Sequence, residues 1–383
     1  MTRRPSVSLA LVTFFLFFLA MPLMSQEKGG GNETGPYEVV PNWPQNPCGE
    51  GYQIGSASGI FVESPDRIFI FARGCLPELT DGSFGEYQSM VPSRNASGYD
   101  LSRDDEARHP VWNYVLYIVD RDGKLVENWD QHNKMFVRPH RVKINPYDPE
   151  RHVWIVDDGA EQVTKFTRDG KKVVMQLGEF RTRGNDESHF GRPTDVAWLP
   201  DGTFFVSDGY VNTRVVKFDK DGNFLMTWGE KGNAPNETRP SYMNTVHGIA
   251  IDNNRRVYVA DRANSRIQVF DENGKYLDEW GDIKRPYYIY MSEDQHLWIS
   301  DGRTQKFLKF NLDGKLLYDW GTFGAFPGGN WGVHQFSADS EGNLYTADVH
   351  VGRVQKYRPK AGADPAHLVG PWRKLSGSPT QTQ

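Results

Sequence analysis

The chain has 383 residues, with 44 lysines and arginines against 49 aspartates and glutamates, and its formal net charge is −5. No basic block interrupts this balance, so the sequence does not predict a nucleic-acid partner. P-loop, H-E-x-x-H, G-x-S-x-G and C-x-x-C motifs are also missing from the sequence, which sets aside several common enzyme classes.

The N-terminus reads MTRRPSVSLALVTFFLFFLAMPLMSQ, with two arginines before an apolar run. This pattern predicts a secretory signal peptide over residues 1–25 and therefore a secreted or periplasmic protein. A transmembrane anchor is the competing interpretation, but the run is short for a bilayer and contains Pro22. We expect no stable membrane span once the leader is removed. Residues 26–36 read as a linker and residues 374–383 as a mobile tail.

The two cysteines, Cys48 and Cys75, border the first predicted strands of the mature chain. Disulfides persist in exported proteins, so a Cys48–Cys75 bridge is expected. Two buried thiols are the alternative, and the sequence alone leaves it open.

An internal repeat dominates the rest of the chain. Five segments align, among them TFFVSDGYVNTRVVKFDKDGNFLMTWG and RVYVADRANSRIQVFDENGKYLDEWG. A sixth, divergent copy combines DRIFIFARG with VLYIVDRDGKLVENW, and residues 75–112 are inserted between its strands. An aspartate marks the same place in each of the five clear copies: Asp157, Asp208, Asp261, Asp301 and Asp348.

Each copy holds several short alternating strands joined by turns such as Asp-Lys-Asp-Gly, which close antiparallel hairpins. A small sheet repeated six times buries its faces by radial stacking, so the repeats predict an all-β, six-bladed β-propeller over residues 37–373. The Trp-Gly ends of the units are typical of NHL-type repeats. The segment GPYEVVPNWP at 35–44 reads as an extra strand that completes the last blade.

Three histidines occupy equivalent positions in this repeat. His247 and His334 each stand 14 residues before a marker aspartate, and His140 stands 17 before one because its hairpin is longer. Thr194 and Tyr287 take the same place in the units between.

Equivalent positions on alternate blades lie about 120° apart around a six-bladed ring, so these three side chains can meet in the central channel. Three imidazoles with one open position are the usual ligand set of a catalytic zinc ion. Only 10 of the 383 residues are histidine, so three alternating hits are hard to attribute to chance. The alternative for each histidine is that it caps a strand and binds water in the channel.

The order RPH…PTDVA…VSDGYVNTRVVKF…WGE…VHGIAI…VADRANSRIQVF…VHQF resembles the peptidyl-α-hydroxyglycine α-amidating lyases over about residues 51–358. The resemblance implies a six-bladed propeller with a catalytic zinc on His140, His247 and His334. It also implies a reactive tyrosine near the metal, at Tyr210.

Two arginines at the substrate, Arg262 and Arg73, follow from the same resemblance, and so does a structural calcium. Its ligands would be the backbone carbonyls of Ile60 and Val142 and the residue after the third histidine. That residue is an aspartate in the family and Gln335 here. A neutral amide is a weaker ligand for a hard cation, so zinc is the expected cofactor and calcium stays open.

His350 follows a marker aspartate, at the same end as Tyr210, and is expected behind the ligands together with Gln335. Gly332 stands where the family usually has methionine.

The reaction that the resemblance implies breaks the C–N bond of an N-acyl-α-hydroxyglycine, giving an amide and glyoxylate. Zinc at the substrate hydroxyl lowers its pKa. A tyrosine held beside the metal can act as the general base, since a nearby cation favours an ionised phenol. Arginines suit the substrate carboxylate through their planar donor fork.

Two other functions remain open at this point: a non-catalytic propeller that binds a partner on its rim, and a metal-dependent hydrolase or lactonase. We expect a monomer that acts on a small or peptide substrate carrying a carboxylate. The sequence does not identify the natural substrate.

Overall fold

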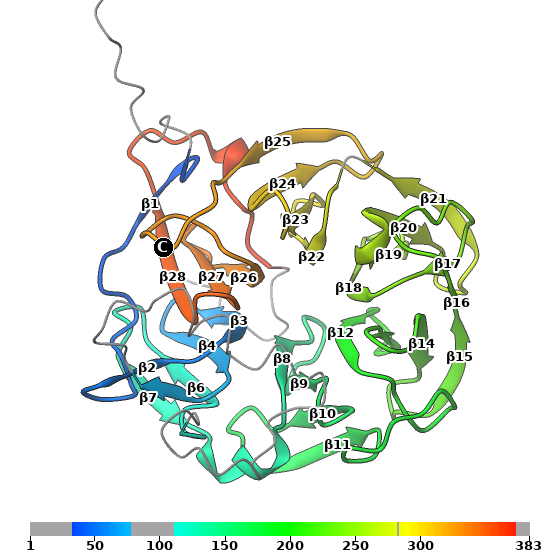
Figure 1. Ribbon diagram of the computed structural model, residues 1–383, viewed down its shortest axis with the longest axis horizontal. Helices are drawn as coiled ribbons and strands as arrows, with labels where there is room; N and C mark the ends of the chain where they lie inside the picture. Colours follow the sequence, from blue (N-terminus) through cyan, green and yellow to red (C-terminus); the bar gives the residue numbers. More distant parts are fainter. Residues whose placement is uncertain (1–32, 78–110, 282, 373–383) are drawn as a thin grey trace, which may run out of the picture.

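The structure, a computed structural model, describes residues 33–77, 111–281 and 283–372. Six four-stranded antiparallel sheets stand radially around a central axis, like the blades of a propeller (Figure 1). The predicted all-β propeller is confirmed. The predicted signal peptide, the tail at 374–383 and most of the insertion at 75–112 lie outside the described residues.

The blades follow one another in chain order, and each runs from an innermost to an outermost strand. Blades 1 to 3 comprise β3 (Ala57–Ser64), β4 (Arg67–Ala72), β6 (Leu116–Val119) and β7 (Leu125–Asn128); β8 (Pro139–Ile144), β9 (Val153–Asp157), β10 (Gln162–Phe166) and β11 (Val173–Leu177); and β12 (Pro193–Trp198), β13 (Phe204–Asp208), β14 (Arg214–Phe218) and β15 (Phe224–Trp228). Blades 4 to 6 comprise β18 (Val246–Ile251), β19 (Val257–Asp261), β20 (Arg266–Phe270) and β21 (Tyr276–Trp280); β22 (Pro286–Met291), β23 (Leu297–Asp301), β24 (Lys306–Phe310) and β25 (Leu316–Trp320); and β26 (Val333–Ala338), β27 (Leu344–Asp348), β28 (Arg353–Pro359) and β1 (Tyr37–Val39).

The sixth blade joins the two ends of the propeller. Its outermost strand is β1, which pairs antiparallel with β28, Tyr37 facing Pro359. The N-terminal strand therefore fastens the ring, as the sequence predicts, and separating the ends requires breaking this ladder.

The marker aspartates explain why the repeat folds as it does. Each ends the second strand of its blade and is buried. The carboxylate of Asp208 accepts the backbone N–H of Gly191 at 2.7 Å and pairs with Arg214 at 2.9 Å. Asp261 does the same with the N–H of Asn244 and with Arg266. The aspartate therefore ties the loop that enters the innermost strand to the second and third strands.

The Trp-Gly ends of the repeats pack one blade onto the next. Trp228 ends β15 and covers Gly274 in the outer turn of blade 4, where φ is +77° and an added Cβ would lie 2.8 Å from the indole. Trp280 meets Gly314 of blade 5 in the same way. Glycine suits this turn for two reasons: it allows the positive φ, and it leaves room for the tryptophan ring.

Short elements complete the described part of the chain. β2 (Tyr52–Ile54) pairs with β5 (Cys75–Pro77), and β16 (Glu230–Lys231) pairs with β17 (Tyr242–Met243). A disulfide links Cys48 to Cys75, as predicted. The described helical turns are η2 (Asp130–Met135), η3 (Arg262–Asn264) and η4 (Pro365–His367). Among the residues with described coordinates, no helix has the length and apolar character needed to cross a membrane.

Candidate metal centre

The innermost strand of every blade loses its regular pairing at the same place, just after its first residue. The register skips one position in blades 1, 2, 3, 5 and 6, and two positions in blade 4. An interruption of this kind changes the direction of the side chain it carries. The position that follows the first residue of each innermost strand is occupied in turn by Ser58, His140, Thr194, His247, Tyr287 and His334.

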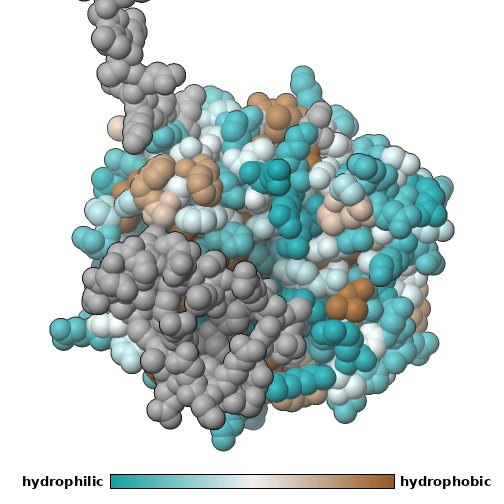
Figure 2. All heavy atoms as spheres, viewed as in Figure 1, coloured by the Kyte–Doolittle hydropathy of each residue, from teal (hydrophilic) through white to brown (hydrophobic). Residues whose placement is uncertain are grey.

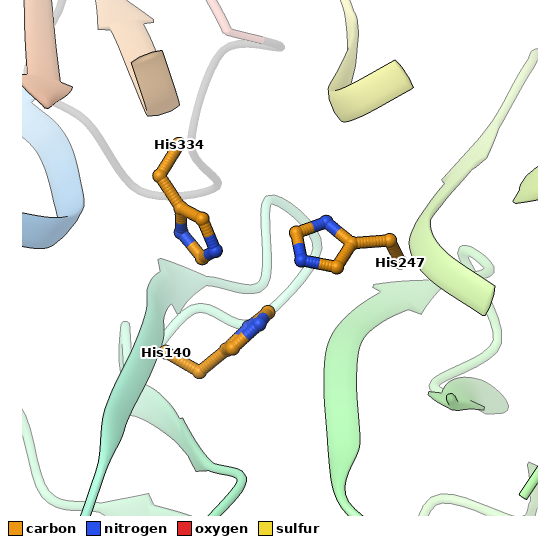
Figure 3. Close-up of side chains that lie close together, drawn as sticks. All are labelled: His140, His247 and His334. Carbon is orange, nitrogen blue, oxygen red and sulfur yellow. The ribbon is translucent and has the colours of Figure 1, made fainter. Parts of the chain in front are cut away.

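The three histidines of this ring meet on the channel axis (Figure 3). The ring centroids of His140 and His334 are 4.5 Å apart, and each of these rings lies 5.0 Å from that of His247. One nitrogen of each imidazole lies within 4.8 Å of the other two. All three side chains are buried. The structure thus brings together the three residues that the repeat placed on alternate blades.

Backbone carbonyls of the neighbouring blades orient the imidazoles. The Nδ1 of His140 lies 2.6 Å from the carbonyl of Thr194, and that of His247 lies 2.6 Å from the carbonyl of Tyr287. The Nδ1 of His334 is 2.8 Å from the carbonyl of Ser58. A carbonyl only accepts, so the Nδ1 of His140 and that of His247 carry the proton and donate it. Their Nε2 lone pairs are left for a ligand, which is how metal-binding histidines are usually held. The Nδ1 of His334 is contacted both by the Ser58 carbonyl and by the Arg141 guanidinium.

The electrostatics also favour neutral imidazoles. Burial lowers the pKa of all three histidines well below the usual histidine value. The Arg141 guanidinium adds to this for His140 and His334, and Arg262 does so for His247. A metal needs the unprotonated nitrogen, so these residues fit a zinc-class ion in their donor atoms and charge.

Tyr210 contacts two of the three histidines, which are called the histidine trio below. Its hydroxyl is 2.7 Å from the Nε2 of His247 and 3.2 Å from the Nε2 of His140. The loop between β13 and β14 delivers this tyrosine because Gly209 crosses the backbone of blade 4 at very close range. A Cβ on Gly209 would lie 1.5 Å from the carbonyl of Val246, so only glycine fits there.

Several guanidinium groups surround the tyrosine ring. Those of Arg192, Arg262 and Arg138 lie 4.2, 5.1 and 5.3 Å from its centroid. Arg138 and Arg192 both pair with the buried Asp158, at 2.6 and 2.8 Å, so one carboxylate offsets one of their two positive charges. The side-chain contacts of Arg262 within the described ranges are with the rings of Tyr210 and Tyr287, and no carboxylate there pairs with it.

Arg73 follows β4 and is 6% exposed. Burial lowers its pKa to about 10, with Arg138, Asp158 and Tyr210 as electrostatic neighbours, so it keeps its charge near neutral pH. The structure thus gathers both predicted arginines around Tyr210, Arg262 in ring contact and Arg73 at longer range.

His350 and Tyr287 line the same end of the channel. The ring of Tyr287 lies 5.7 Å from that of His247 and 6.5 Å from that of His350. Burial, with Arg285, Arg73 and Arg262 nearby, lowers the pKa of His350. His350 also accounts for Gly332, whose φ is +83° and whose added Cβ would lie 2.2 Å from the imidazole. No methionine side chain fits there.

Gln335, Ile60 and Val142, the residues considered for calcium, bond to one another instead of leaving oxygen atoms free for an ion. The Nε2 of Gln335 donates to the carbonyl of Val142 at 2.8 Å. Its Oε1 accepts the N–H groups of Ile60 and Val142, at 3.3 and 3.4 Å. The amide therefore uses both ends within the protein and places an N–H donor on the carbonyl that calcium would need. These residues do not fit the ion.

Sequence reasoning missed Arg138, Arg192 and Asp158. A signal was present: Arg138 and Arg192 occupy the same place in the repeat, directly before the proline that opens an innermost strand. Asp158 and Arg262 are likewise equivalent, each following a marker aspartate. The hairpin tips and strand entries of several blades therefore build one shared rim around the trio.

Figure 2 shows that the coloured part of the face in view is mostly hydrophilic, with smaller hydrophobic patches. Fold and site together define a six-bladed NHL-type propeller with a three-histidine centre in its channel. The NHL repeat family model matches residues 243–270. A crystal structure of a protein of unknown function from Bacteroides thetaiotaomicron aligns with a TM-score of 0.51 and 12% identity. That alignment covers 80% of this chain and 70% of that one, and it shows the fold alone.

Proteins similar in sequence to this chain include amidating enzymes. A probable peptidyl-α-hydroxyglycine α-amidating lyase of Caenorhabditis elegans is 36% identical over 219 residues, which is 57% of this chain and 56% of that protein. Peptidyl-glycine α-amidating monooxygenase A of Xenopus laevis is 27% identical over 342 residues, 83% of this chain and 33% of the frog protein. The matches thus span about half of the first relative and a third of the second. The resemblance to the amidating lyases is confirmed, and it supports an enzyme.

Proposed function

We propose that this protein is a metal-dependent carbon–nitrogen lyase that cleaves an N-acyl-α-hydroxyglycine to an amide and glyoxylate. One observation carries the proposal. Three buried neutral imidazoles point their Nε2 atoms at one place in the channel, and the Tyr210 hydroxyl lies against two of them. His140, His247 and His334 would hold a zinc-class ion.

When bound, such an ion acts as a Lewis acid that stabilises negative charge developing on the substrate hydroxyl oxygen. Tyr210 then serves as the general base. Its oxygen takes the hydroxyl proton, the C–O bond becomes a carbonyl, and the C–N electron pair leaves with the nitrogen. The nitrogen takes up a proton, which Tyr210 can supply, so the amide and glyoxylate form without any oxidant or reductant.

The arginines divide into two roles. Arg138 and Arg192 are paired with Asp158 and hold the Tyr210 ring in place. Arg262 lies 5.1 Å from the Tyr210 centroid with its charge uncompensated among the described residues, so it is placed to bind the substrate carboxylate. Arg73 contributes a second positive charge on the same side. A guanidinium suits this task because its N–H donors match both carboxylate oxygens.

Export completes the proposal. The disulfide fits an oxidising compartment, and the leader-like residues 1–25 would direct the chain there. N-terminal sequencing of the protein recovered from a secreting host tests this point, and a chain that still starts at Met1 would contradict it.

The function is tested with N-benzoyl-α-hydroxyglycine as substrate. Metal-loaded protein should release glyoxylate and benzamide in equal amounts, and a His247→Ala variant should release neither. His189→Ala is the matched control, because this partly exposed histidine pairs with Asp186 and Glu179 and not with the three channel histidines. A correctly folded protein with one bound metal ion and no turnover would overturn the assigned reaction.

A further inference from the structure

One level below the histidines, a single side chain spans the channel. Arg141 belongs to β8, next to His140, and is fully buried. Its Nη2 donates to the carbonyls of Tyr287 at 2.8 Å and His247 at 3.4 Å. Its Nη1 reaches the carbonyls of His140 at 3.3 Å and Ser58 at 3.5 Å, and it contacts His334. One guanidinium from blade 2 thus connects blades 1, 4, 5 and 6.

Two of these carbonyls also orient the metal ligands. The Tyr287 carbonyl accepts from His247, and the Ser58 carbonyl lies 2.8 Å from the Nδ1 of His334. Arg141 therefore fixes the groups that hold two of the imidazoles. This makes it a positioning residue, since it acts through these carbonyls and through its contact with the Nδ1 of His334.

The other polar side chains at this depth of the channel also have partners within the protein. Gln335 of blade 6 bonds Ile60 of blade 1 and Val142 of blade 2. Lys143 and Asp195 form a buried ion pair at 2.6 Å between blades 2 and 3. Asp195 also accepts the N–H of Ile249 in blade 4, at 3.2 Å.

The charge at this level is positive. Arg141 and Lys143 carry two positive charges, and Asp195 is the one carboxylate that the described residues place against them. Electrostatic repulsion is strong where water is excluded, so a divalent cation added here would meet an uncompensated guanidinium. The carbonyls that could bind it already have N–H donors.

We propose that Arg141 serves as the internal cation of this channel in place of a structural calcium ion, so that the fold of this protein is independent of calcium. A calcium ion would draw the blades together by accepting oxygen ligands from several of them. The guanidinium has five N–H donors in a rigid fork and reaches carbonyls of four blades. The neutral Gln335 fits this exchange, because its amide bonds the backbone of Ile60 and Val142 and supplies no charge for a second cation.

Thermal unfolding of the full chain, loaded with zinc, tests the first part of the proposal. Elemental analysis of the protein as purified should find no calcium. Because EGTA also binds zinc, protein treated with EGTA is reloaded with zinc before Tm is measured. Its Tm should then agree within about 1 °C with that of the same protein in millimolar calcium chloride. A calcium ion retained at one per chain, or a Tm that rises when calcium is added to the zinc-reloaded protein, would overturn the proposal without touching the assigned reaction.

Variants at position 141 test the second part. Arg141→Met removes the donors and should lower Tm by roughly 5 °C or more, since several buried carbonyls lose their partners. Arg141→Lys keeps one charged donor group and should recover part of the loss. An Arg141→Met protein with the wild-type Tm would contradict the assigned role.

A double variant gives a readout that a purely structural role would not move. Arg141→Ala with Gln335→Asp removes the guanidinium and adds a carboxylate beside the carbonyl of Val142, so its Tm should rise on adding calcium. Gln335→Asp alone is the matched control, because its carboxylate would pair with Arg141 and its Tm should ignore calcium. A calcium response equal in both variants would show that Arg141 does not occupy the position of the ion. If the double variant does not fold, the calcium comparison on the native protein still tests whether the fold depends on calcium.

Discussion

Replacing Tyr210 by phenylalanine separates proton transfer from metal binding. The variant keeps the aromatic ring that Arg192 covers at 4.2 Å and loses the hydroxyl beside His247 and His140. Removing a general base lowers kcat by about 10²–10⁴, which corresponds to about 3–5 kcal/mol of transition-state stabilisation. Tm should change little, because the imidazole nitrogens bind the metal ion in the loaded protein.

The assay is glyoxylate release at saturating substrate, with zinc content measured on the same samples. Tyr117→Phe provides the control, since this buried hydroxyl belongs to blade 1 and has no hydrogen-bond partner among the described atoms. Its kcat should match the wild type. The reasoning is refuted if Tyr210→Phe turns over at the wild-type rate, because the tyrosine would then only pack against the arginines.

Three further outcomes are expected. Arg262→Ala should raise KM by about 10–100-fold, the range for losing a charge-assisted hydrogen bond. A change confined to kcat in steady-state assays would show that Arg262 does not bind the substrate carboxylate. In metal-free protein, the lowered pKa values of the three histidines mean that below about pH 6.5 the unfolded chain binds protons that the folded protein refuses. Tm should therefore fall between about pH 7.5 and 5, and a flat profile by calorimetry would count against buried neutral imidazoles. The Cys48–Cys75 bridge spans 27 residues and should contribute about 3 kcal/mol to the free energy of unfolding; two thiols titrating in unreduced, unfolded protein would rule it out.

The repeat made the ligand positions readable from the sequence. Four of the five clear copies have the same spacing of 14 residues before the marker aspartate, so His247 and His334 could be aligned by counting. The longer hairpin before Asp157 explained the spacing of 17 for His140. The closing strand was also visible, because an isolated alternating segment at the N-terminus needs a partner, which β28 provides. Periodicity and spacing are local properties, and the sequence carries them directly.

The role of Arg141 could not be read in this way. Strict alternation would point adjacent residues of a strand to opposite sides, so His140 and Arg141 should not both reach the channel. The register interruption between Pro139 and Arg141 breaks that rule. The partners of Arg141 come from four other blades, a long-range arrangement that no single repeat records. The same holds for Asp158, whose two arginine partners belong to the entries of different blades.

The central claim is a single catalytic metal ion on His140, His247 and His334. Zinc should be titrated into metal-free protein while glyoxylate release from N-benzoyl-α-hydroxyglycine is followed. Activity should rise in proportion to added zinc, stop at one equivalent per chain, and be absent at every zinc level in His247→Ala. Activity that is full without metal, or that survives in His247→Ala, would contradict the account.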